Sequence, residues 1–125
     1  MARILIAEDE EALCAMCARG LSSDGHEVMT ARDGSEALDV LIREKGRFDL
    51  LLTDVRMPIM DGIALALAAA RDFPELTILL MTGYADQRER AHGLEAIIHD
   101  VITKPFSLSA LRGTVREALT VRARG

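Results

Sequence analysis

The chain has 125 residues, half of them apolar, and a formal net charge of −5. This length indicates one domain with a substantial core, and the acidic balance excludes the basic surface typical of proteins that bind nucleic acid directly. No apolar run reaches the roughly 20 residues of a membrane span, and the N-terminus lacks the pattern of a secretory signal peptide. We therefore expect a cytoplasmic protein without membrane insertion.

In the first half of the chain, short apolar runs alternate with longer stretches of helical period. The elements expected there are strands at 3–7, 27–31 and 49–53 and helices at 10–23 and 33–45. Turn-forming Asp24-Gly25 separates the first helix from the second strand, and Gly46 follows the second helix. The pattern predicts successive strand-helix units.

The second half of the chain continues this alternation. The elements expected there are strands at 77–81 and 100–103 and helices at 63–72, 85–94 and 107–121. The helix at 63–72 ends before Pro74, because a residue that precedes proline disfavours the helical region. Five strand-helix units with nearly all-apolar central strands predict a parallel sheet with helices on both faces. We expect a doubly wound α/β domain over residues 1–125, with no output domain.

Cys14 and Cys17 form a C-x-x-C pattern, which could indicate redox chemistry or half of a zinc site. However, no further cysteines or paired histidines could complete a zinc site. Leu13, Cys17 and Leu21 recur at the spacing of one helical face. We therefore expect these cysteines to be small core residues.

Polar side chains follow the predicted strands. They are Glu8-Asp9 after the first strand, Asp54 after the third, Thr82-Gly83 after the fourth and Lys104-Pro105 after the fifth. Ligands of open α/β sheets bind beyond the carboxyl ends of the strands. If the strand order is 2-1-3-4-5, the first and third strands are neighbours, and three carboxylates share one crevice.

Three clustered carboxylates repel one another unless a cation lies among them. An all-oxygen ligand set favours a hard divalent ion, and Mg²⁺ fits better than zinc. With a lysine and a threonine hydroxyl, these groups make up a phosphoryl-binding site in which Asp54 is the nucleophile and becomes an aspartyl phosphate. Taken singly, Glu8-Asp9 could cap a helix and Asp54 could cap the following turn.

The motifs in their order resemble the receiver domain of bacterial two-component response regulators. They are the acidic pair Glu8-Asp9, "LLLTDVRMPIMDG" at 50–62, "MTG" at 81–83 and "TKPF" at 103–106. The resemblance covers residues 3–121 and implies a flavodoxin-like (βα)5 fold with a sheet order of 2-1-3-4-5. It also implies a signalling module and not an enzyme.

The resemblance implies roles for individual residues. Asp54 would accept a phosphoryl group from a phosphohistidine on a sensor kinase or a histidine phosphotransfer protein. Asp9 and Asp54 would bind Mg²⁺ with the backbone carbonyl of Arg56, and Glu8 would hold the ion directly or through water.

Other positions would bind the phosphoryl group or shape the loops. Thr82 would hydrogen-bond one phosphoryl oxygen, and Lys104 would pair with another. The bond between Lys104 and Pro105 resembles one that is cis in this family, and Gly62 is a turn glycine.

Two positions depart from the usual pattern of the family. Many receivers carry an aromatic switch residue three positions before the lysine, where this chain has Val101. One hypothesis is that Tyr84 switches instead; the alternative is an exposed tyrosine that only shields the phosphoryl group. Tyr84→Ala would separate them through the phosphorylation dependence of partner binding. Arg56, the second position, either projects over the phosphoryl group or pairs with an acidic neighbour.

Three classes of function remain open at this stage. The leading one is a stand-alone, phosphorylation-controlled module that binds an unknown downstream protein or relays phosphate, with homodimerisation undecided. The second is an adaptor active when unphosphorylated, for example one that delivers substrates to a protease. The third is a phosphatase of the haloacid-dehalogenase type, which is disfavoured because Arg56 stands where a second acid is required.

Overall fold

The computed structural model describes residues 1–83 and 89–124. Its strands are β1 (Arg3–Ala7), β2 (Glu27–Ala31), β3 (Leu50–Asp54), β4 (Thr77–Thr82) and β5 (Asp100–Thr103), and its helices include α1 (Glu11–Ser23), α2 (Gly34–Arg43), α3 (Gly62–Asp72) and α5 (Leu108–Arg124). All strands are parallel and form one sheet in the order β2-β1-β3-β4-β5. The predicted fold class and strand order are confirmed.

Differences from the predicted elements are confined to element ends and to one helix. β4 extends to Thr82, and α5 extends to Arg124. Residues 85–88 of the helix expected at 85–94 lie outside the described residues, as does Tyr84. Residues 89–91 are helical, but 92–94 form a turn and irregular structure, so the helix ends three residues earlier than expected.

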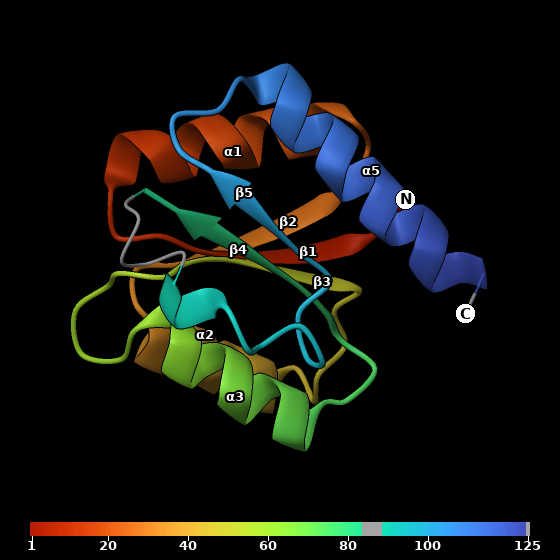
Figure 1. The fold of residues 1–125 in the computed structure, drawn as a ribbon. Helices are drawn as coiled ribbons and strands as arrows, with labels where there is room; N and C mark the ends of the chain where they lie inside the picture. Colours follow the sequence, from red (N-terminus) through yellow and green to blue (C-terminus); the bar gives the residue numbers. More distant parts are fainter. Residues whose placement is uncertain (84–88, 125) are drawn as a thin grey trace.

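Helices cover both faces of the sheet, with α1 and α5 on one side and α2 and α3 on the other (Figure 1). The central strands supply both layers because successive side chains of a strand point to opposite faces. Leu5 belongs to the core layer beneath α2 and α3, whereas Ile4 and Ile6 belong to the layer beneath α1 and α5. All three side chains are fully buried, which explains why β1 is apolar without alternation.

The loop from β3 to α3 holds the backbone around Asp54 through a close contact. Gly62 donates its N–H to the Val55 carbonyl at 2.8 Å. A Cβ atom at position 62 would lie 1.9 Å from the Asp54 carbonyl oxygen, so only glycine fits there. The role predicted for Gly62 as a turn glycine is thus a steric one. Asp61 starts α3 by accepting a hydrogen bond from the Ala64 N–H at 2.9 Å.

The two cysteines are free and lie on α1. Cys17 is completely buried, and Cys14 is half-buried. Burial raises the pKa of the Cys17 thiol to about 11, so this thiol stays protonated and chemically quiet. The prediction that Cys17 is a core residue is confirmed.

Within residues 1–83 and 89–124, no helix combines the length and apolarity needed to cross a bilayer.

Candidate functional site

Strand register brings the first two acidic positions together. β1 pairs with β3 so that Ala7 lies opposite Thr53. The next residues along these strands are Glu8 and Asp54, which therefore meet at the carboxyl edge of the sheet. Both are buried, with exposed fractions of 2% and 6%. Burial of two adjacent carboxylates is unfavourable without compensating charge, so this edge is chemically unusual.

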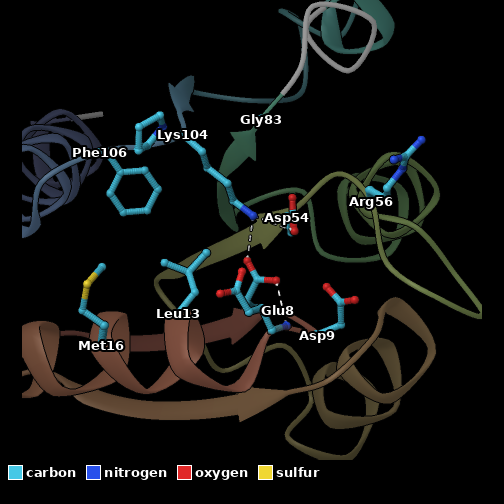
Figure 2. Close-up of a pocket in the computed structure, with 11 residues that line it drawn as sticks. Glu8, Asp9, Leu13, Met16, Asp54, Arg56, Gly83, Lys104 and Phe106 are labelled. Carbon is cyan, nitrogen blue, oxygen red and sulfur yellow. Dashed lines mark hydrogen bonds and ion pairs between the residues drawn. The ribbon is translucent and has the colours of Figure 1, made fainter.

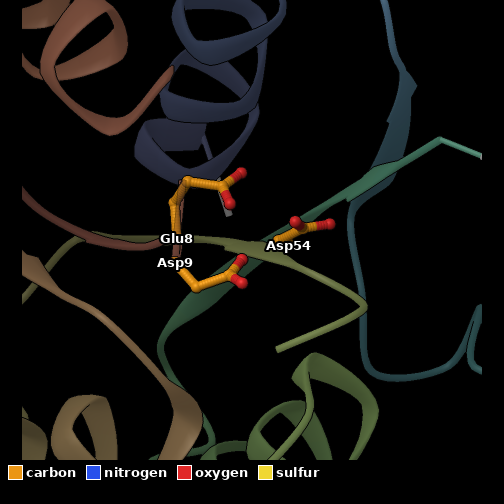
Figure 3. A group of neighbouring side chains, drawn as sticks. All are labelled: Glu8, Asp9 and Asp54. Atoms are coloured by element: carbon orange, nitrogen blue, oxygen red, sulfur yellow. The ribbon is translucent and has the colours of Figure 1, made fainter. Parts of the chain in front are cut away.

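Asp9 completes a cluster of three carboxylates at this edge. One carboxylate oxygen each from Glu8, Asp9 and Asp54 lies within 4.8 Å of the other two (Figure 3). Asp9 is exposed, whereas the other two are buried, so an ion could enter from the side of Asp9. The all-oxygen donor set and this spacing fit a hard divalent cation, and Mg²⁺ characteristically binds through a few carboxylates and several waters. The residues present therefore fit the predicted magnesium site.

Lys104 enters the same edge from the end of β5. Its backbone N–H donates to the Thr82 carbonyl at 2.6 Å, which fixes it beside the end of β4. The Lys104 ammonium donates to Asp54 Oδ2 at 2.8 Å and to Glu8 Oε1 at 3.0 Å (Figure 2). Burial alone would lower the pKa of Lys104, but hydrogen bonds to Asp54 and Glu8 outweigh it and raise this pKa. The lysine is therefore a fixed positive charge.

Glu8 shows that one ammonium does not neutralise the cluster. Burial raises the pKa of Glu8 to about 7, and the charge of Asp54 adds to this effect. The Glu10 N–H, which donates to Glu8 Oε2 at 3.1 Å, acts in the opposite direction, as does Lys104. The carboxylates would hold their charges more readily with a divalent cation among them.

Thr82 and the residues beside it complete the edge. The Thr82 side chain is buried, and its Oγ1 has no hydrogen-bond partner among the residues that the structure describes. An unsatisfied buried hydroxyl is costly, and one at a strand end is a candidate donor to a ligand. The Lys104-Pro105 peptide bond is cis, as predicted.

A pocket of about 660 Å³ opens onto this edge of the sheet. Its polar wall includes the acidic cluster, Arg56, Gly83 and Lys104, and its apolar wall comprises Leu13, Met16 and Phe106. Sequence reasoning missed this apolar wall, although Leu13 and Met16 stand one helical turn apart on α1. The side chains at the two positions that depart from the usual family pattern lie apart from the acidic cluster. Figure 2 shows the side chain of Arg56 pointing away from Asp54. Val101 lies on β5 and does not line this pocket; it is half-buried against the core layer of α2 and α3.

Comparison with known proteins agrees with this geometry. The family model described as the response regulator receiver domain matches residues 4–116. Response regulator MprA from Mycobacterium tuberculosis (strain ATCC 25618 / H37Rv) is 37% identical over 117 residues, as is MprA from Mycobacterium avium (strain 104). These alignments cover 94% of this chain and 50% of each relative. The chain thus spans about half the length of these curated relatives.

Solved structures show the same architecture. A CheY-like response regulator receiver domain protein from Methanospirillum hungatei JF-1 superimposes with a TM-score of 0.90 at 29% identity, covering 99% of this chain and 98% of the other. Response regulator TrrA from Thermotoga maritima, solved in complex with Mg²⁺-BeF, superimposes with a TM-score of 0.83 at 27% identity. This alignment covers 94% of this chain and 99% of the TrrA chain.

Proposed function

Because this chain belongs to the response regulator receiver domain family of two-component signalling, we propose that Asp54 accepts a phosphoryl group from a phosphohistidine. The supporting observation is that Lys104 holds Asp54 and Glu8 together at the end of the sheet, with Asp9 within reach. The donor would be a sensor kinase or a histidine phosphotransfer protein. We place the exchange in the cytoplasm, where ATP supports kinase activity.

In this step, a carboxylate oxygen of Asp54 forms a bond to phosphorus while the bond from phosphorus to the donor imidazole nitrogen breaks. The imidazole leaves and takes up a proton. Lys104 neutralises charge on the phosphoryl oxygens, and Thr82 Oγ1 donates the hydrogen bond for which it has no described partner. Glu8, Asp9, Asp54 and the Arg56 carbonyl would hold Mg²⁺, which supplies further neutralisation of phosphoryl charge.

Phosphorylation adds about −1.5 to −2 charges and three acceptor oxygens beside Lys104 and Thr82. We propose that the resulting shift in conformation changes the affinity for a downstream protein. Switching by Tyr84 stays a prediction, since this residue lies outside the described part of the chain. The absence of an output domain and the choice between activated module, relay and adaptor also stay predictions.

The direct test is intact mass spectrometry after incubation with acetyl phosphate and Mg²⁺. We expect one phosphoryl adduct that is lost at alkaline pH, as acyl phosphates are. Replacing Mg²⁺ by EDTA should remove most of the adduct, because the clustered carboxylates would then repel the incoming phosphoryl group. A chain that stays at its unmodified mass with Mg²⁺ present would rule out the proposal.

Arg56 is proposed to tune the lifetime of the aspartyl phosphate from the wall of the pocket. We expect Arg56→Ala to change the first-order decay rate of the adduct by about twofold to tenfold, because a cation in the wall of the pocket affects both water access and local charge. Decay is followed by intact mass after removal of acetyl phosphate. An Arg56→Ala decay rate equal to the wild-type rate would contradict this role.

A further inference from the structure

An exposed apolar side chain stands at the tip of the loop between β3 and α3. Ile59 is 85% exposed, and among the described residues only the N-terminal Met1 exposes more of a large apolar side chain. Its neighbour Pro58 is also exposed. Single exposed apolar side chains are common on protein surfaces, so exposure alone assigns no role to Ile59, and its backbone supplies the second observation.

The backbone at Ile59 is strained. Its φ angle is +70°, and the Met60 N–H donates to the Pro58 carbonyl at 2.7 Å. A hydrogen bond between residues two apart around a positive φ is the mark of a rare and strained γ-turn. A β-branched residue is especially disfavoured there, whereas glycine or asparagine would fit more easily. The chain therefore carries a β-branched side chain, a type poorly suited to this turn.

The loop around Ile59 is held firmly at its base. The Met60 carbonyl accepts from the Gly34 N–H at 2.9 Å, and Gly62 packs against the backbone of Asp54. These contacts fix the turn irrespective of the side chain at its tip. Strain that persists in a fixed turn points to a function of the residue that bears it.

The loop that carries Ile59 borders the edge of the sheet that an incoming phosphodonor must reach. The loop starts directly after Asp54 and extends beyond the sheet on the side to which the β4 arrow points (Figure 1). Asp54 is only 6% exposed, so a phosphohistidine on a protein can reach it only if that protein covers the surrounding rim. A small donor such as acetyl phosphate needs no contact with the rim. The two kinds of donor therefore differ in their need for Ile59.

We infer that Ile59 is a specificity anchor that inserts into an apolar hollow on the protein that carries the phosphohistidine. This inference rests on the proposed function of Asp54. Burying an exposed isoleucine at a protein interface corresponds to about tenfold to hundredfold in affinity. Ile59 thus favours protein donors with a matching apolar surface and leaves the chemistry at Asp54 unchanged.

The test compares phosphorylation by a phosphohistidine protein with phosphorylation by acetyl phosphate. The histidine kinases and phosphotransfer proteins of the source organism are purified, phosphorylated with labelled ATP and screened for transfer to the wild-type chain. For the fastest donor, we expect Ile59→Asn to lower kcat/KM by about tenfold or more. Ile59→Leu, which keeps an apolar side chain, should remain within about threefold of wild type.

Three controls separate docking from damage. Ile59→Asn should react with acetyl phosphate at the wild-type rate, and its Tm should be unchanged or higher because asparagine tolerates a positive φ. Ile42→Gln removes another exposed isoleucine, 57% exposed on α2, and should change none of these measurements.

Equal kcat/KM values for wild type and Ile59→Asn would overturn the inference. So would a parallel loss with acetyl phosphate, which would indicate damage to the site. If no protein donor phosphorylates the wild-type chain, the anchor is refuted, while an adduct from acetyl phosphate would still support the function of Asp54. Failure with both kinds of donor would refute the proposed function itself.

Discussion

Asp54→Asn is expected to abolish phosphorylation by acetyl phosphate in the presence of Mg²⁺, whereas the wild-type chain gains one labile phosphoryl group. The reason is chemical: an amide oxygen carries no negative charge and is a poor nucleophile, although it has nearly the same shape as the carboxylate. The amide oxygen can still accept a hydrogen bond from Lys104, which in the wild type lies 2.8 Å from Asp54 Oδ2. Circular dichroism should show an intact fold, and intact mass should show no adduct.

The matched control for this substitution is Asp39→Asn. Asp39 is exposed on α2 and takes no part in the acidic cluster. We expect the Asp39→Asn variant to be phosphorylated at the wild-type rate. An adduct of equal yield on Asp54→Asn would show that another residue accepts the phosphoryl group.

Lys104→Met is expected to have the second largest effect. The Lys104 ammonium is the hydrogen-bonded cation between two buried carboxylates, at 3.0 Å from Glu8 and 2.8 Å from Asp54. Removing one partner of a buried ion pair leaves uncompensated charge; since the Lys104 side chain is 22% exposed, water offsets part of the cost. We expect a loss of about 2–3 kcal/mol in the free energy of unfolding at pH 8 without divalent ions. Phosphorylation should slow by about 100-fold.

The free energy of unfolding should also depend on pH, because Glu8 titrates differently in the folded and unfolded chain. The pKa of Glu8 is raised to about 7 by its burial and by Asp54, so the folded chain holds a proton that the unfolded chain releases. Stability therefore falls as pH rises from about 4.5 to 7 in the absence of divalent ions. Lys104 lowers the pKa of Glu8, so this fall should be larger in Lys104→Met.

Urea unfolding at pH 5 and pH 8, each with EDTA or Mg²⁺, measures these effects. Mg²⁺ should stabilise Lys104→Met at pH 8 more than it stabilises the wild type, because the ion supplies the missing positive charge. The same substitution at the exposed Lys45 serves as control and should behave as wild type. A variant as stable as wild type at pH 8 with EDTA would show that the ammonium does not compensate the buried carboxylates.

The fold was predictable because its strands are simple in sequence. Runs such as residues 50–52 and 78–81 are apolar throughout, since both faces of a central parallel strand are buried. The residues that follow the strands then predicted the edge where Glu8, Asp54 and Lys104 meet, because parallel strands place their carboxyl ends together. Periodicity and strand order were thus sufficient to predict most of the residues of the candidate site.

Other features depend on packing that no sequence pattern indicates. The contact between Lys104 and Glu8 joins residues 96 positions apart and depends on side-chain conformations at two strand ends. The positive φ of Ile59 contradicts the preference of isoleucine, so local propensity predicts the wrong backbone there. The apolar wall at Phe106 forms only when the segment after β5 lies against α1.

Trapping the acyl phosphate identifies the phosphorylated residue, which we propose is Asp54. After incubation with acetyl phosphate and Mg²⁺, borohydride reduces an aspartyl phosphate to homoserine, and peptide mass spectrometry then locates the changed residue. We expect homoserine at position 54 alone, and only when acetyl phosphate was present. Homoserine in place of another aspartate, or none at position 54 in a sample that carries the adduct, would show that Asp54 is not the phosphoacceptor.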